Sequence, residues 1–262
     1  SRSDITLPVE NEVDILTKFE QPLRDGKFHA NLGGNFRSDE SLAYGAVKFS
    51  QSVTNNMHAS LRLGVNEISY ESGALRSLGA KDTILLSLSS QLTRQTHLQF
   101  DIDGHRYLTR QGSTLGKGYK MQGILGSSLL TGAQDWQVRL QGTWESNDLK
   151  QNLPSELKGL FGPSASSVET LILPNFGTLG MGTTFRYGPH DQGILRRPFI
   201  HGDVWAGWVW PANVVGYNSR AAMGISLFGS DILSVGGFYS NVQGGRAGQA
   251  FSGVNFQYSV GF

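Results

Sequence analysis

The sequence lacks cysteine, has little charge and contains no long hydrophobic run. Of its 262 residues none is cysteine, 8 are proline and 16% are charged. The missing cysteines exclude a disulfide scaffold, thiolate metal sites and cysteine nucleophiles. No segment reaches the roughly 18 uninterrupted apolar residues of a membrane-spanning helix, because the longest candidate, residues 204–215, is interrupted by Gly207, Pro211 and Asn213. These absences argue against disulfide-rich domains, helical membrane proteins and densely charged soluble domains.

Glycine is, by contrast, almost twice as frequent as usual. The chain holds 34 glycines, where average usage of about 7% would give roughly 18. Charged residues fall well below the share of about 25% in a typical soluble domain. A glycine-rich, charge-poor chain without a hydrophobic helix suits a transmembrane β-barrel. The formal net charge of +1 gives no basic surface for nucleic acid, so we expect no such partner.

Alternation with a period of two is the main structural signal. In the last segment, apolar residues occupy one parity, and glycine, asparagine, glutamine and serine occupy the other. About 13 segments of this kind follow one another along the chain, and helical spacing fits almost nowhere. The pattern predicts an all-β fold, a transmembrane antiparallel up-and-down β-barrel. The apolar residues of the last segment are Val254, Phe256, Tyr258, Val260 and Phe262.

The number of strands follows less directly. Bacterial single-chain barrels have even strand numbers, so we expect about 14 strands, within a range of about 12 to 16. The additional strand could come from residues 4–9, from residues 168–173, or from sequence before Ser1. Aromatic spacing fits a bilayer: Trp136 and Trp144 share a face and lie about 26 Å apart along a strand, which a tilt of about 40° reduces to about 20 Å of height.

The longest link, residues 147–175, is the least barrel-like segment. Pro154 is placed to start a short helix, to which Leu157, Leu160 and Phe161 would give an apolar side. Links of this length are usually functional or disordered. We expect a lid or plug over the pore, and the alternative is an ordinary exposed loop.

The polar parity predicts the residues that line the interior. Several glycines fall mainly on this parity, and we expect them to leave room for a water-filled lumen. The candidate charged residues on the substrate path are Asp14, Asp101, Asp103, Glu145, Asp203 and Arg139. The glycines are Gly64, Gly126, Gly180, Gly182, Gly224, Gly236, Gly253 and Gly261.

The same polar residues also suggest an enzymatic interpretation. Asp101, Asp103 and His105 share one strand, and His201 and Asp203 share another, an arrangement similar to the Asp and His residues of outer-membrane proteases. Same-face residues on a strand are about 6.6 Å apart, so direct contact would need these strands to be neighbours. No Gly-x-Ser-x-Gly or His-Glu-x-x-His motif occurs. We therefore expect no enzyme, no metal and no cofactor.

The final third of the chain, residues 199–262, carries a family resemblance, most specifically over residues 218–231. It resembles the C-terminal barrel of exopolysaccharide secretion porins, closest to the PelB type, with the cellulose exporter BcsC as an analogue. In that family a periplasmic tetratricopeptide-repeat domain precedes the barrel. The resemblance implies that residues 1–262 form one outer-membrane barrel, a fragment without that domain, since no 34-residue helical repeat is present.

The resemblance also implies a function, which is passive export of a linear exopolysaccharide in biofilm formation, at the outer membrane of a Gram-negative bacterium. The polymer would be Pel-type, rich in N-acetylgalactosamine and galactosamine, and Tyr44 and Trp205 could stack on its sugar faces or simply fill lumen space. Implied partners are a PelC-like lipoprotein, outer-membrane lipids and the barrel-assembly machinery. An uptake porin and an outer-membrane hydrolase remain as alternatives.

Overall fold

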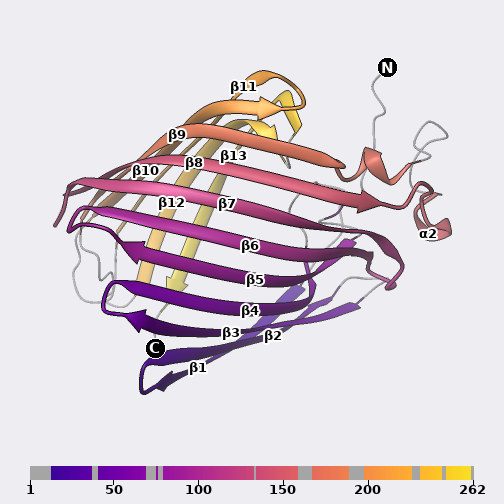
Figure 1. Ribbon diagram of the computed structural model, residues 1–262, viewed down its shortest axis with the longest axis horizontal. Coiled ribbons are helices and arrows are strands. Elements are labelled where there is room, and N and C mark those ends of the chain that lie inside the picture. Colours follow the sequence, from indigo (N-terminus) through magenta and orange to yellow (C-terminus); the bar gives the residue numbers. More distant parts are fainter. Residues whose placement is uncertain are drawn as a thin grey trace. The chain divides into compact units, whose positions relative to one another are not determined.

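A computed structural model describes residues 13–36, 41–68, 75, 79–132, 134–158, 167–188, 198–225, 231–243 and 246–260. The described chain contains 13 strands, and each is hydrogen-bonded to its neighbours in sequence order, from β1 through to β13 (Figure 1). The strands are Val13–Leu23 (β1), Gly26–Phe36 (β2), Ser41–Thr54 (β3), Met57–Glu67 (β4), Gly79–Gln91 (β5), Thr96–Thr109 (β6), Thr114–Leu130 (β7), Gln134–Leu149 (β8), Asn175–Tyr187 (β9), Phe199–Trp210 (β10), Val214–Ile225 (β11), Asp231–Gln243 (β12) and Arg246–Val260 (β13). The predicted all-β, antiparallel up-and-down fold is confirmed.

The period of two places large apolar side chains on one face of the strands. Phe256 is 79% exposed and Met181 is 68% exposed, which is unusual for side chains of this size in a protein surrounded only by water. On the opposite parity lie buried or half-buried polar groups such as Asn35, His105 and Glu145. Each strand therefore separates an apolar surface from a polar one. No helix among the described residues is long and apolar enough to cross a bilayer.

The expected fourteenth strand does not lie at residues 168–173. This segment begins with a 3-10 turn, Val168–Thr170 (η1), in which the Ser167 side chain accepts a hydrogen bond from the Glu169 amide. Val168, Leu171 and Ile172 are all buried. Because these three side chains all point into one core, the segment packs as a turn, and a strand here was a wrong prediction. The second location, residues 4–9, lies outside the described residues.

The polypeptide divides into two compact units, which we describe separately. The first comprises Ser1–Ser90, Gln99–Gln122 and Trp144–Phe176, and the second comprises Gln91–Leu98, Gly123–Thr143 and Gly177–Phe262. The first unit contains the largest hydrophobic cluster of the described chain. Its buried members are Leu75, Tyr107, Leu115, Leu153, Leu157, Val168, Leu171 and Ile172.

Candidate functional site

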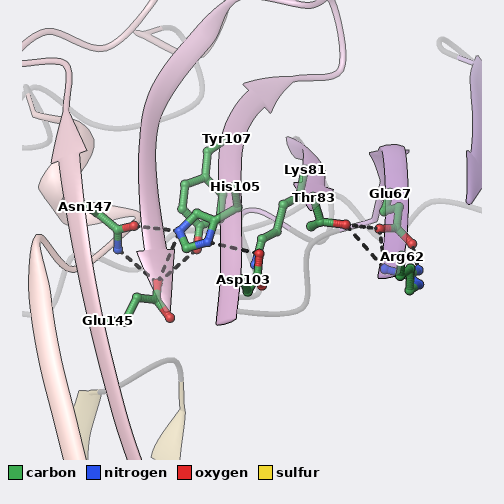
Figure 2. A network of polar contacts seen from close by, with 9 residues as sticks. All are labelled: Arg62, Glu67, Lys81, Thr83, Asp103, His105, Tyr107, Glu145 and Asn147. Atoms are coloured by element: carbon green, nitrogen blue, oxygen red, sulfur yellow. Dashed lines mark hydrogen bonds and ion pairs between the residues drawn. The ribbon is translucent and has the colours of Figure 1, made fainter. Parts of the chain in front are cut away.

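A buried group of polar side chains connects β6 and β8 in the first unit (Figure 2). We call Asp103, His105, Tyr107, Glu145 and Asn147 the anchor cluster. Odd-numbered residues of both strands share the polar face, as the alternation predicts. The His105 side chain is fully buried, and that of Glu145 is 2% exposed. These groups are therefore shielded from water and depend on one another for hydrogen bonds.

Asn147 is at the centre of the anchor cluster. Its Nδ2 donates to Glu145 Oε1 at 2.9 Å and to the Leu173 carbonyl at 2.9 Å. These two acceptors fix the orientation of the amide, so its Oδ1 must be the acceptor of the 2.8 Å hydrogen bond from His105 Nε2. The Tyr107 hydroxyl donates to the same Glu145 oxygen at 3.1 Å. Each member of this group therefore holds the next in a defined orientation.

A glycine on β7 allows this contact between strands that are not adjacent. β7 lies between β6 and β8, so His105 and Asn147 meet across it. A Cβ atom at Gly118 would lie 2.0 Å from Asn147 Oδ1 and 2.9 Å from His105 Nε2. Both distances are shorter than any non-bonded contact. The absence of a side chain at Gly118 is thus a condition for the anchor cluster.

The polar contacts continue from β6 to β4 through β5. Lys81 Nζ lies 3.4 Å from Asp103 Oδ2 and 5.4 Å from the centre of the Tyr107 ring. Thr83 occupies the same face of β5 and donates to Glu67 Oε2 at 2.8 Å. Glu67 in turn forms a two-pronged ion pair with Arg62. Figure 2 shows these residues as a row that continues the anchor cluster.

The anchor cluster also holds the long link between β8 and β9. Asn147 binds this link twice. Its side chain donates to the Leu173 carbonyl, as described above, and its backbone N–H donates to the Pro174 carbonyl at 2.6 Å. A one-turn helix, Ser155–Lys158 (α2), follows Pro154, and Leu157 is buried with Leu153 in the hydrophobic cluster that includes Tyr107. The expected short helix and its apolar side are present at Pro154 and Leu157. Leu160 and Phe161 lie outside the described residues.

A second polar cluster lies in the second unit and has the same construction. Arg139 on β8 reaches across β9 to Asp203 on β10, with Nη1 to Oδ2 at 2.8 Å and Nη2 to Oδ1 at 3.1 Å. Thr184 accepts from Arg139 at 2.7 Å and donates to Asp203 at 2.7 Å. A Cβ atom at Gly182 would lie 2.9 Å from the guanidinium carbon. We call Arg139, Thr184 and Asp203 the ion-pair cluster, and its two charged side chains are each 20% exposed.

Most glycines of the polar parity do not leave open space, which corrects our expectation. A Cβ atom at each of them would collide with a side chain from a neighbouring position, because rings and charged groups lean into the room that glycine provides. The covering residues are Glu67 and Thr83 over Gly64, His97 over Gly126, Trp205 over Gly180, Arg139 over Gly182, Phe199 over Gly224, Asn255 over Gly236 and Phe238 over Gly253. Gly261 lies outside the described residues.

The remaining predicted path residues are dispersed. Asp14 lies on β1 opposite Asn35, and Asp101 accepts a 2.8 Å hydrogen bond from Gln99. Tyr44 covers Gly33, its cross-strand partner, with its ring. Asp103 and Glu145 enter the anchor cluster, Arg139 and Asp203 form the ion-pair cluster, and Trp205 lies beside the latter. Our prediction thus named these residues but not their pairing.

Several residues of the anchor cluster and of the row that continues it were missed. Lys81, Glu67, Tyr107 and Asn147 were not among the candidates, although Tyr107 and Asn147 have the same parity as candidates on their own strands, β6 and β8. Gly118 was missed as well. The signal in the sequence is a glycine on the polar parity of a strand whose two neighbours carry complementary polar groups. To recognise it, one must know the register between the strands, which the sequence pattern does not give.

The residues of the protease-like arrangement have other partners. Asp103 and His105 lie on β6, whereas His201 and Asp203 lie on β10, and three strands separate these two in the sheet order. Asp203 is instead paired with Arg139, and His105 with Asn147. Within the described residues, no group of three or more His, Cys, Asp or Glu side chains has an arrangement that could hold a metal ion.

Comparison with known proteins agrees with this fold. The sequence model of a family described as "PelB, C-terminal beta barrel domain" matches residues 1–261. Among solved structures, a chain described as "Bacterial polysaccharide outer membrane secretin" aligns with a TM-score of 0.61 at 9% sequence identity, over 94% of this chain and 78% of that chain. At this identity the second likeness concerns the fold alone. The sequence has no significant match among curated proteins.

Proposed function

The chain belongs to the family of PelB C-terminal β-barrel domains, and on this premise we propose that it forms an outer-membrane pore through which a polysaccharide leaves the cell passively. The structural observation that carries the proposal is the division between the two faces of its strands. One face exposes large side chains such as Leu32 and Met181, and the other carries ion pairs and hydrogen-bonding groups. Such a wall suits lipid on one side and a hydrated, hydroxyl-rich polymer on the other.

The pore is proposed to be non-enzymatic. The carboxylates and imidazoles that would have to activate water are engaged in structural hydrogen bonds and ion pairs, as at His105 and Asp203. A hydrated polymer passing along a wall needs transient hydrogen bonds, and the side chains of the ion-pair cluster offer them. Transport without a bond being broken is therefore the simpler function for this polar face.

We further propose that the link between β8 and β9 acts as a plug. Its described residues pack in the cluster that contains Tyr107, a residue of the polar parity, and its carbonyls at Leu173 and Pro174 bind Asn147 of the same face. Both contacts draw the link toward the polar side of the strands. A link attached at that side is positioned to narrow the path that the polar face lines.

The identity of the polymer and of the partners extends this proposal. We propose a Pel-type polymer rich in N-acetylgalactosamine and galactosamine, exported during biofilm formation in a Gram-negative bacterium. A PelC-like lipoprotein would deliver it at the periplasmic side, and the barrel-assembly machinery would insert the chain among outer-membrane lipids. We also propose that a periplasmic tetratricopeptide-repeat domain precedes residues 1–262 in the protein. These points are supported by family membership and by the resemblance described above.

Ion conductance across planar lipid bilayers tests the pore directly. We expect the full chain to conduct weakly and a variant lacking residues 154–173 to conduct strongly, because removal of the plug opens the path. As a matched control, the substitution Gly123→Ala on β7 should leave conductance unchanged, since a Cβ atom there meets nothing within 4 Å. Absence of conductance from the deletion variant, when it is folded and inserted, would contradict the pore. Equal conductance of the full chain and the deletion variant would contradict the plug.

A further inference from the structure

We propose that Trp205, together with the ion-pair cluster beside it, forms a binding subsite for an uncharged sugar ring, with the indole as a stacking platform. The inference rests on the proposed polysaccharide pore and deepens it, because it assigns one place on the wall and one chemical class of sugar. The observations concern only the second unit, in which β9, β10 and β11 are consecutive neighbours.

The indole of Trp205 lies flat against the backbone of three strands. Cβ atoms built at Gly180, Gly207 and Gly216 would lie 2.8, 2.7 and 3.4 Å from atoms of its ring. These glycines belong to β9, β10 and β11, respectively, so one broad face of the ring covers the sheet itself. The residue as a whole is half-buried. The ring face that points away from the sheet is therefore the one available to a ligand on the polar side of the strands.

This position is maintained by packing at the expense of a hydrogen bond. The indole Nε1 is buried and has no hydrogen-bond partner in the described part of the chain. A buried tryptophan usually satisfies its N–H, because leaving such a donor unpaired is energetically unfavourable. If the ring stood away from the sheet, its Nε1 could donate a hydrogen bond to a protein acceptor or to water. The flat orientation therefore calls for a different explanation, and presentation of an aromatic face is one that accounts for all three glycines.

Polar groups suited to hydroxyls adjoin the platform. Gly182 is the cross-strand partner of Trp205, and the Arg139 guanidinium covers it. Four of the five N–H groups of an arginine are used here, by Gln141, by Thr184 and twice by Asp203. Within the described part of the chain, one N–H at Arg139 Nη2 and one lone pair at Asp203 Oδ1 are not used, so both are available to a ligand. An aromatic face bordered by a donor and an acceptor matches a sugar ring, whose C–H face is apolar and whose rim carries hydroxyls.

The surrounding charge selects among sugars. Arg220 is the cross-strand partner of Asp203. Arg220 and Arg139 place two arginines beside one aspartate, so the local field is positive. Such a field opposes a protonated amino sugar. The subsite is therefore assigned to N-acetylated or otherwise uncharged hexoses, and not to their deacetylated cationic forms.

Blockade of the ion current by added sugar tests this subsite. The probes are a hexamer of N-acetylgalactosamine and its fully deacetylated counterpart, applied to the conducting chain in a planar bilayer. We expect the acetylated hexamer to block the current and the deacetylated hexamer to block it with at least about tenfold lower affinity. Trp205→Ala should shorten the residence of the acetylated hexamer about tenfold, the scale of one aromatic contact of about 1.4 kcal/mol, and Trp205→Tyr should restore much of it.

The controls separate the subsite from the pore and from folding. Trp208→Ala, on the apolar parity, should leave blockade unchanged. Lack of conductance would contradict the proposed function, whereas normal conductance with unchanged blockade in Trp205→Ala would contradict the subsite alone. Stronger blockade by the deacetylated hexamer would overturn the assigned sugar class. If Trp205→Ala does not insert, Arg139→Gln still tests the site, because it removes the charged polar component and should shorten the residence of the acetylated hexamer. An unchanged residence in Arg139→Gln would contradict the subsite.

Discussion

The two polar clusters are built alike but differ in their surroundings. In each, a side chain reaches across an intervening strand to a partner two strands away, and a glycine on that strand makes room, Gly118 in the anchor cluster and Gly182 in the ion-pair cluster. The anchor cluster is buried beneath the β8–β9 link and includes Glu145 Oε2, a carboxylate oxygen without a hydrogen-bond partner in the described chain. In the ion-pair cluster the charges are paired in two-pronged geometry and partly exposed.

This difference shows how one construction serves two purposes. Where the cluster is buried, every lost hydrogen bond leaves a group that water cannot reach, so the contacts hold the link rigidly. Where the cluster is partly exposed, water or a passing hydroxyl group can take the place of a lost partner, so each contact can be exchanged for another. The anchor cluster is thus suited to fixing a segment, and the ion-pair cluster to exchanging partners with a polymer.

The largest expected difference comes from filling the two glycines. In Gly118→Ala the new methyl group would collide with Asn147 Oδ1 at 2.0 Å and with the Ser146 carbonyl at 2.5 Å, and the second of these is backbone and cannot move aside. We expect a loss of about 3 kcal/mol in the free energy of unfolding, from overpacking and a broken buried hydrogen bond. Urea unfolding of the protein in detergent micelles, followed by tryptophan fluorescence, measures it.

Gly182→Ala is the counterpart in the other cluster. Its nearest obstacle is the end of the Arg139 side chain at 2.9 Å, which can shift toward solvent, and the Val204 carbonyl follows at 3.0 Å, against 2.5 Å for the carbonyl beside Gly118. A shift of a few tenths of an ångström therefore admits the methyl group, and we expect a loss of about 1 kcal/mol. Gly202→Ala on β10, where a Cβ atom meets nothing within 4 Å, controls for the effect of alanine itself. Equal losses in the free energy of unfolding for Gly118→Ala and Gly182→Ala would contradict the proposed difference between the two clusters.

Removing the Asn147 side chain, which binds the β8–β9 link, should have an effect of intermediate size on the stability of that attachment. Asn147→Ala deletes the bonds to His105, Glu145 and Leu173, and we expect it to destabilise the attachment of the link by about 2 kcal/mol. Hydrogen exchange of residues 150–158 and 167–174, read by mass spectrometry, should accelerate while exchange in β10 and β11 stays the same. Thr184→Ala, the comparable substitution in the ion-pair cluster, should leave exchange in the link unaltered. Unchanged exchange in Asn147→Ala would show that the hydrophobic cluster alone holds the link.

The smallest expected effect is the coupling between Arg139 and Asp203. A double-mutant cycle with Arg139→Gln and Asp203→Asn should give a coupling free energy of at most about 1 kcal/mol, because solvent screens a partly exposed pair. The measurement is again the free energy of unfolding in urea. A coupling of about 3 kcal/mol or more would place this pair in the same class as the buried cluster and remove the contrast between them.

The sequence predicted the strands and their two faces well, but not the contacts between strands. Alternation assigns Asp103, Glu145 and Arg139 to the polar face because parity is a local property of each strand. The meeting of His105 with Asn147 depends on the registers of two successive strand pairs, which no local pattern contains. The glycines were misinterpreted for the same reason, since parity shows where the space lies but not which neighbouring side chain, such as Trp205 or Arg139, occupies it.

The claim that the strands separate lipid from water is tested most directly by cysteine labelling, because the chain has no cysteine of its own. Gln141→Cys and Leu140→Cys are adjacent on β8 but lie on opposite faces, and Ser60→Cys and Leu61→Cys form an equivalent pair on β4. In lipid vesicles, we expect a charged, water-soluble maleimide to label positions 141 and 60 and to spare positions 140 and 61. Labelling of positions 140 and 61 with protection of 141 and 60 would contradict the assignment of the two faces, and with it the pore.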